Sequence, residues 1–308
     1  MKQEQKPRSP WLTVILIIFG LTLISLVLAG VVGLFIDAPA VGNVAVIKIV
    51  GPISVERATG WGVTATSSRE VLKLLQDAED DPGIDAILLD INSPGGSAVA
   101  SDEIGQAVKN SSKPTVALIR ELGASGGYWV ASASDHVVAN RLSLTGSIGV
   151  IGSYLEFAGL MDRYNVTYRR LVAGKYKDMG SPFKELTPEE EQLFQSVLDD
   201  MRSEFIDEVA RNRNLPRAQV ERLATGQIYL GKQALELGLV DELGSEEEAK
   251  TYLHSRLNIT VDLVPFDPEP SLLDILGGVF HAQSFTLGKG IGTGLAQQAE
   301  QAGLPQLR

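Results

Sequence analysis

The sequence has no cysteine and only three histidines among its 308 residues. Without cysteine there are no disulfides, thiolate metal sites or cysteine nucleophiles. The histidines (His136, His254 and His281) show no metal-ligand spacing. We therefore expect neither redox chemistry at sulfur nor a metalloenzyme.

Positive charge is also scarce, because 27 basic residues face 38 acidic ones and the formal net charge is −11. This acidity argues against nucleic-acid binding. Apolar residues make up 44% of the chain and charged residues 21%. That balance supports a buried core and excludes a globally disordered, collagen-like or coiled-coil protein.

Charge is absent altogether from Trp11 to Ile36, a stretch of 26 residues. As a helix it would be about 39 Å long, enough to cross a bilayer with tilt. A cleaved secretory signal has an apolar region of only about 7 to 15 residues, so an uncleaved anchor is the better interpretation, although Ala-Pro-Ala at 38–40 resembles a cleavage site. The basic residues within 1–10 favour a cytoplasmic N-terminus. We expect a single-pass protein of the cytoplasmic membrane with its working domain on the extracytoplasmic side.

After the anchor, β-branched apolar runs alternate with amphipathic segments. The runs predicted as strands are 44–50, 86–91, 115–119 and 136–138. Helices are predicted at 68–79, at 97–109 and from about Ser125. This alternation predicts an α/β fold with a mainly parallel sheet covered by helices.

A long helix is predicted from Thr187 to about Arg213, because Thr-Pro-Glu-Glu supplies an N-cap, a proline at N1 and a capping-box glutamate. Its apolar stripe either packs on the parent domain or contacts another subunit, and the sequence leaves both open. The stripe comprises Leu193, Phe194, Val197, Leu198, Met201, Phe205 and Val209. From about Ser271 the chain is rich in glycine and glutamine and is predicted to be a mobile tail.

Three glycine-bearing loops each follow a predicted strand, at 92–96, 123–127 and 145–149. The carboxyl ends of parallel strands are where open α/β sheets bind ligands. Ser125 is the sharpest nucleophile candidate, since the surrounding glycines let a strand turn abruptly into a helix and present its hydroxyl.

A serine nucleophile needs a base. His136 is better interpreted as a surface or core-edge residue, because it opens an apolar strand. The remaining base is a lysine, which acts only when neutral and therefore when burial lowers its usual pKa of about 10.4. Lys175 and Lys177 are both candidates; in a strand they would share a face, and spacing alone does not choose between them.

Taken together, five ordered motifs make the chain resemble the bacterial signal peptide peptidase A group, in its short single-domain form, of membrane-anchored serine-lysine proteases. The likeness covers about residues 42 to 255. The motifs are Asn-Ser-Pro-Gly-Gly at 92–96, Gly-Ala-Ser-Gly-Gly-Tyr-Trp at 123–129, Thr-Gly-Ser-Ile-Gly-Val at 145–150, Gly-Lys-Tyr-Lys-Asp at 174–178 and Gly-Leu-Val-Asp-Glu-Leu-Gly at 238–244.

The resemblance implies that Ser125 is the nucleophile, Lys177 the general base and Ser147 the hydroxyl that holds the lysine amine. The backbone amides of Gly96 and Gly126 are then expected to form the oxyanion hole, and no metal or organic cofactor is needed. Asp178 would spoil the base if it faced Lys177, but strand alternation would turn it away.

The resemblance also implies a core of Clp peptidase and crotonase type, assembly of subunits into a ring, and active sites where neighbouring subunits meet. The expected organisation is a cytoplasmic N-terminus (1–10), an anchor (11–36), a protease domain (42–265) and a tail (266–308). The expected function is a serine endopeptidase that degrades remnant signal peptides, which are apolar, after their release from secretory precursors.

Three alternatives remain. A crotonase-like acyl-CoA enzyme would share the fold, but the export signal argues against it. A non-catalytic, stomatin-associated type of membrane scaffold would need none of Ser125, Ser147 and Lys177. A related protease acting on other membrane proteins is not distinguished from a signal peptide peptidase by any sequence feature.

Overall fold

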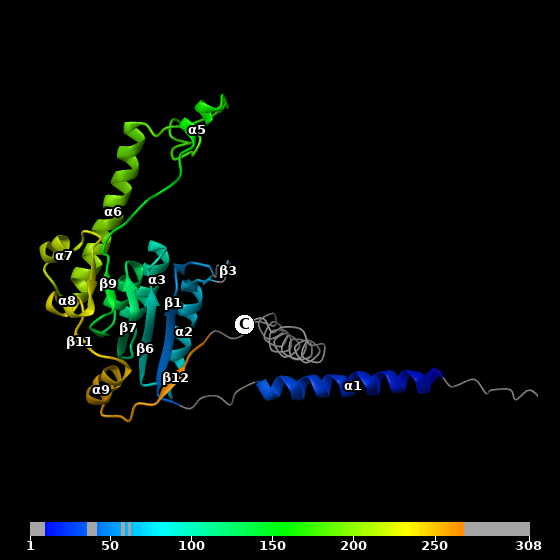
Figure 1. Cartoon of the computed structure of the whole chain (residues 1–308). Coiled ribbons are helices and arrows are strands. Elements are labelled where there is room, and N and C mark those ends of the chain that lie inside the picture. The colour runs from blue at the N-terminus through cyan, green and yellow to red at the C-terminus, as the bar shows by residue number, and fades with distance from the viewer. Residues whose placement is uncertain (1–9, 36–41, 57–58, 61–62, 268–308) are drawn as a thin grey trace, which may run out of the picture.

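The computed structural model describes residues 10–35, 42–56, 59–60 and 63–267 (Figure 1). The predicted tail therefore falls almost wholly outside the described residues, as do residues 1–9 of the predicted cytoplasmic terminus.

The elements alternate along the chain much as the sequence predicts. The strands are β1 (Val44–Val50), β2 (Ile53–Ser54), β3 (Thr59–Gly60), β4 (Val63–Thr64), β5 (Thr66–Ser67), β6 (Ala86–Ser93), β7 (Thr115–Ala124), β8 (His136–Ala139), β9 (Leu144–Gly146), β10 (Ile228–Leu230), β11 (Glu242–Leu243) and β12 (Leu263–Pro265). The helices are α1 (Pro10–Phe35), α2 (Ser68–Asp80), α3 (Ala98–Lys109), α4 (Gly126–Ser132), α5 (Ala158–Arg163), α6 (Pro188–Arg213), α7 (Arg217–Leu223), α8 (Gly231–Glu236) and α9 (Glu246–Leu257).

One sheet organises the domain, with strand order β10-β9-β7-β6-β1-β12 and with β8 and β11 alongside β7. Its pairs are parallel except β9 with β10. The mainly parallel α/β fold predicted from the sequence is confirmed. The finer expectation, a core of Clp peptidase and crotonase type, stays a prediction.

Both faces of the sheet are buried, which explains the uninterrupted apolar runs of its central strands. Residues 45, 47 and 49 of β1 face α2, α3, α4 and α6 in the larger core cluster, together with 87, 89 and 91 of β6. The alternate residues 44, 86 and 88 pack on the other face against Ala249 and Leu253 of α9. Figure 1 shows the helices on the two sides of the sheet.

A projection that we call the arm (residues 150–198) leaves the domain between β9 and the middle of α6 (Figure 1). The capping box at Thr187 and Glu190 is present as predicted. Part of the apolar stripe of α6 packs on the domain, as one interpretation predicts, and part of it is exposed. Phe205 and Val209 are buried in the domain, whereas Leu193 and Val197 are 38% and 55% exposed in the arm.

The segment predicted as an anchor is helical, as α1. Within the described part of the chain, which leaves out the side chains of residues 27–35, no helix is found that is long and apolar enough to cross a membrane. The anchor stays a prediction.

Candidate active site

Ser125 occupies a sharp turn between β7 and α4. Its φ of 52° lies in the left-handed region, which non-glycine residues rarely adopt. The turn is fixed from both sides, because the Ser125 amide donates to Gly146 O at 2.8 Å and its carbonyl accepts from Trp129 N at 2.9 Å. Uncommon backbone geometry held in this way is frequent at reactive serines and other functional positions.

The loop after β6 passes directly against this turn. A β-carbon on Gly96 would lie 2.1 Å from Ile53 O, and one on Gly95 would lie 2.5 Å from Gly126 N. A β-carbon on Gly126 would lie 2.2 Å from Ser101 Oγ. At Gly95 and Gly96 only glycine lets the two backbones come so close, and at Gly126 a β-carbon would clash with the Ser101 side chain, so the glycines are needed for packing as well as for turning.

The close approach brings two free donors together. In the part of the chain that the structure describes, no acceptor takes a hydrogen bond from the amide of Gly96 or of Gly126. The neighbouring amides are used, since Ser97 N donates to Ile53 O and Gly95 N to Ser93 Oγ. Two unused amides beside a serine can stabilise an oxyanion.

Ser147 lies near Ser125 although it belongs to the loop after β9, because β7 and β9 pair side by side with Gly123 opposite Thr145. It also has a positive φ, 51°, and its amide donates to Gln227 O at 2.8 Å. Ser125 and Ser147 line one pocket of about 690 Å³. Its lining is Pro94, Gly96, Ala98, Ser125, Gly126, Trp129, Ser147, Gly149, Val150, Ile151, Met201, Arg202, Phe205, Ala224, Thr225 and Gly226.

The pocket wall is largely apolar. Trp129 stacks on Phe205 with ring centroids 4.6 Å apart, and Met201 lies on the same side of α6. Tyr128, in contrast, is fully buried and donates to Leu239 O at 2.8 Å, so it packs in the core. Concave, mostly apolar pockets with a few polar groups are typical of ligand-binding sites.

Lys177 does not line this pocket and lies instead on the arm, between α5 and α6. Residues 174–179 form consecutive turns there, with Lys177 N donating to Gly174 O. The strand that we considered for Lys175 and Lys177 is therefore wrong, and the alternation argument for Asp178 does not apply. None of residues 171–180 is buried, so this segment has no apolar face packed on a core that would stabilise it as a strand.

The lysines of the arm differ in whether they form ion pairs. Lys175 Nζ contacts both carboxylate oxygens of Glu189 at 2.7 Å, and this pairing raises the pKa of Lys175 well above its usual range. Lys184 Nζ pairs with Glu190 at 2.5 Å. Lys177 has no ion-pair partner among the described residues. A lysine held in an ion pair is a poor proton acceptor, which argues against Lys175 as the base.

The Asp178 carboxylate also has ion-pair partners. Arg170 Nη2 donates to its Oδ1 at 2.8 Å, and Lys184 Nζ lies 3.7 Å from the same oxygen. The Arg170 hydrogen bonds lower the pKa of the Asp178 carboxyl. Its charge is thus compensated by Arg170 rather than by Lys177.

His136 lies at the edge of the core, as predicted. Its side chain is 15% exposed and stacks on Tyr252, and Nε2 is 3.2 Å from Glu242 Oε2. No three histidine or acidic side chains come together as a metal site within the described ranges. Several pocket residues were not singled out from the sequence, and the charged one among them is Arg202. Its position in a predicted amphipathic helix gave no signal that it would face a site.

Comparison with known proteins decides the family. The model of peptidase family S49 matches residues 107–260. A protein named as a protease from Methanocaldococcus jannaschii is 36% identical over 228 residues, which cover 73% of this chain and 73% of the relative. The chain belongs to peptidase family S49.

Other S49 relatives agree. A protease from Synechocystis is 38% identical over 232 residues, covering 72% of this chain and 83% of its own. A signal peptide peptidase SppA from Enterococcus faecium is 36% identical, covering 61% of this chain and 56% of its own. The chain is therefore a serine peptidase of the SppA type, and its match to the first two relatives is consistent with the short single-domain form. This family excludes the acyl-CoA enzyme and argues against a scaffold without chemistry.

Proposed function

We propose that this S49 peptidase is a membrane-anchored endopeptidase that uses Ser125 and Lys177 to degrade remnant signal peptides. The observation that carries the proposal is the position of Ser125, which lines an apolar pocket beside the two unused amides of Gly96 and Gly126. Every group that peptide-bond cleavage requires is then available except the base.

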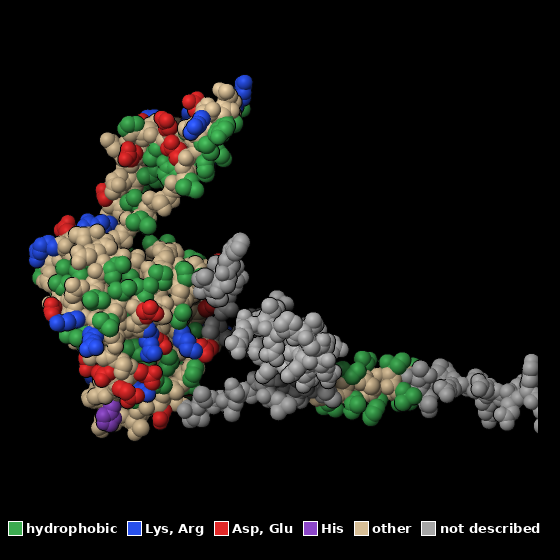
Figure 2. Space-filling view, in the orientation of Figure 1, with side chains coloured by type: hydrophobic (Ala, Val, Ile, Leu, Met, Phe, Trp, Pro, Cys, Tyr) green, Lys and Arg blue, Asp and Glu red, His purple; other side chains and the backbone are tan. Residues whose placement is uncertain are grey.

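The base comes from a neighbouring copy in this proposal. Lys177 of the same chain lies on the arm, which projects from the domain (Figure 1), and it is not among the residues that line the pocket. Exposed apolar side chains line the arm (Figure 2), among them Ile151, Leu155 and Leu171. Contiguous exposed apolar surface of this kind is typical of subunit contacts. A ring of copies would bury it and would deliver each Lys177 to the next Ser125.

Chemically, the Ser125 oxygen attacks the peptide carbonyl while its proton passes to the neutral Lys177 amine. The oxyanion is held by the amides of Gly96 and Gly126. The C–N bond then breaks, the leaving amine takes the proton from Lys177, and an acyl-enzyme remains. Lys177 then takes a proton from a water molecule, whose oxygen attacks the acyl carbonyl. The ester bond to Ser125 breaks, the acid leaves, and Lys177 returns the proton to the Ser125 oxygen. Ser147 orients the lysine amine, and no cofactor is involved.

The substrate is inferred from the pocket and from the predicted anchor. The apolar wall suits the hydrophobic segment of a signal peptide, and α1 would hold the domain at the extracytoplasmic surface of the membrane where such remnants lie. The relative from Enterococcus faecium is named as a signal peptide peptidase.

The proposal is tested by hydrolysis of a quenched apolar peptide with detergent-solubilised protein. We expect Ser125→Ala and Lys177→Ala to lower turnover by about a thousandfold or more, because each removes a group that acts in the bond-breaking step. Lys175→Ala is the matched control, since its amine is bound by Glu189, and it should retain turnover. Equal activity in all four proteins would refute the assignment of Ser125 and Lys177.

The shared site is tested by producing Ser125→Ala and Lys177→Ala subunits together in one cell. If lysine and serine come from neighbouring copies, random mixing makes about a quarter of the sites complete, and activity returns. Mixtures that stay inactive, although both variants co-purify in one assembly, would show instead that each chain completes its own site.

A further inference from the structure

The pocket beside Ser125 contains a charged side chain that the proposed mechanism does not use. Arg202 of α6 is the single charged residue of those that line it. A guanidinium in a largely apolar pocket is costly unless an anion compensates it. Across residues 10–35, 42–56, 59–60 and 63–267, Arg202 makes no ion pair.

The hydrogen bonds of Arg202 leave one edge of its guanidinium open. Nε and Nη2 donate to Ala224 O at 3.0 and 2.7 Å. A guanidinium has five N–H groups in a planar fork, so two of them are used here. The remaining edge, formed by Nη1 and the second hydrogen of Nη2, matches the spacing of carboxylate oxygens and can bind both of them.

The bond to Ala224 also fixes this edge in the pocket. The loop 224–226 forms part of the pocket wall and is tied to the opposite loop, since Gly226 N donates to Ile148 O at 3.1 Å. Arg202 is partly buried and follows Met201, which also lines the pocket. The cation therefore has a set position on the wall that Ser125 shares, and its rotamer entropy is already lost before a ligand arrives.

From these contacts we infer that Arg202 is a specificity residue that binds a carboxylate of the peptide substrate. The inference rests on the proposed peptidase site and names a feature of its substrate. Two sources offer this group: the free C-terminal carboxylate that an earlier cleavage leaves on a peptide, and an acidic side chain near an apolar segment. A peptide with neither would bind through its apolar side chains alone.

Binding to the uncleaving Ser125→Ala protein separates this inference from the question of catalysis. The probes are three fluorescent peptides of one apolar sequence: the free acid, the C-terminal amide, and the amide with glutamate as its last residue. We expect the free acid, the glutamate peptide or both to bind about ten- to a hundredfold more tightly than the plain amide at pH 7. The peptide that gains affinity identifies the source of the carboxylate.

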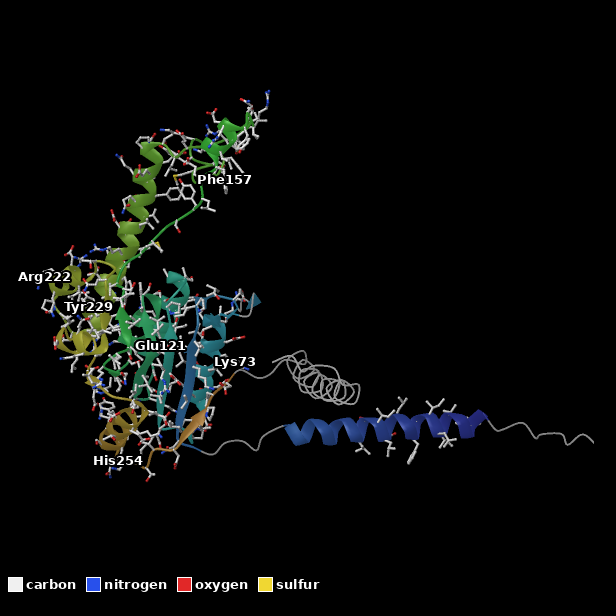
Figure 3. The ribbon with its side chains drawn as sticks, in the orientation of Figure 1. Lys73, Glu121, Phe157, Arg222, Tyr229 and His254 are labelled. Atoms are coloured by element: carbon white, nitrogen blue, oxygen red, sulfur yellow. The ribbon has the colours of Figure 1, made fainter. Side chains whose placement is uncertain are left out.

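Adding Arg202→Gln should remove this preference, because glutamine carries no positive charge to bind a carboxylate. Glutamine is chosen because its amide can still donate towards Ala224 O. Arg222→Gln is the matched control. Arg222 is exposed on α7 at the outer edge of the domain (Figure 3) and does not line the pocket, so its variant should keep the preference.

Equal affinity for the three peptides, or a preference that survives Arg202→Gln, would overturn the inference. The proposed function is judged by cleavage in the protein that retains Ser125. Cleavage without a carboxylate preference would leave the peptidase proposal intact and reject the role of Arg202. A carboxylate preference without cleavage would reject only the peptidase proposal.

Discussion

At the scale of single residues, the candidate site depends on glycines, which have no side chain to keep neighbouring backbones apart. Gly95 lets the loop after β6 lie against the Ser125 turn, and Gly96 lets it pack on Ile53 of β2. The amides of Gly96 and Gly126 lie in this region without a hydrogen-bond acceptor among the described residues. Ser125 then supplies the hydroxyl from a backbone conformation that few residues adopt. The candidate site is therefore built mainly from backbone.

Gly96→Ala should for this reason inactivate the enzyme. Its β-carbon would lie 2.1 Å from Ile53 O, so the backbone of residue 96 must move and its amide leaves the oxyanion position. We expect turnover to fall about 100- to 1000-fold, as for loss of one oxyanion donor, and the free energy of unfolding to fall by about 1–3 kcal/mol.

Steady-state kinetics and urea unfolding would measure the two effects. Gly83→Ala is the control, because its β-carbon would meet only the flexible side-chain oxygen of Asp81, at 3.2 Å. A Gly96→Ala protein with normal turnover would show that this amide is not part of the oxyanion hole.

At the scale of elements, most of the core was predictable from the sequence because its strands are short, apolar and bounded by turn residues. β1 has the predicted bounds, and α6 begins at its predicted capping box. β7 is longer than predicted. The polar residues Arg120 and Glu121 interrupt its apolar run, yet the strand continues because its second half pairs with β9.

The site was predictable only in part, for a related reason. Ser125 and Ser147 are recognisable because each stands in a glycine loop after a strand, which is local information. The place of Lys177 on an arm, and of Arg202 in the pocket, depends on how α6 packs against α4. No spacing in the sequence encodes that packing.

The end of α6 is tied to the sheet by an ion pair between Arg213, whose side chain is buried, and Asp241, whose side chain is 32% exposed. Removal of the carboxylate should be costly. Arg213 Nη1 and Nη2 lie 2.8 and 2.5 Å from the Asp241 carboxylate, which also accepts from Val137 N of β8 at 2.7 Å. We expect Asp241→Asn to lower the free energy of unfolding by about 3 kcal/mol at pH 7, because Arg213 is left without its anion.

The same pair gives a pH dependence. Burial is the largest single effect and acts to raise the pKa of Asp241, but the hydrogen bonds and charge of Arg213, the Val137 amide and the nearby His136 together outweigh it, so the pKa is lowered. The stabilisation is therefore present above the unfolded value of about 3.9 and is lost as the pH falls through the lower folded value. Urea unfolding should show the gap between wild type and Asp241→Asn narrowing below about pH 4. Glu221→Gln removes an exposed ion pair with Arg217 and should change the free energy of unfolding little at any pH. A difference between wild type and Asp241→Asn that stayed constant with pH would contradict this account.

At the scale of the whole molecule, the arm is the feature that a single chain does not explain. It exposes Leu155 at 74% and Leu171 at 99%, and it places Lys177 away from the pocket that holds Ser125. Phe157, labelled in Figure 3, lies beside α5 in the same projection. Burial of this apolar surface by a second copy would stabilise the assembly and complete the active site in one step.

Leu155→Asp and Leu171→Asp should therefore disrupt assembly and activity together while leaving the domain folded, since both side chains are exposed in the monomer. We expect light scattering to show smaller particles and peptide turnover to fall by about tenfold or more, because a buried charge opposes the contact. Leu142→Asp is the matched control, since Leu142 is 64% exposed on the turn after β8, away from the arm. If the arm variants stayed assembled and active, the arm would face solvent in the working enzyme, and Lys177 would have to reach Ser125 by a movement of its own chain.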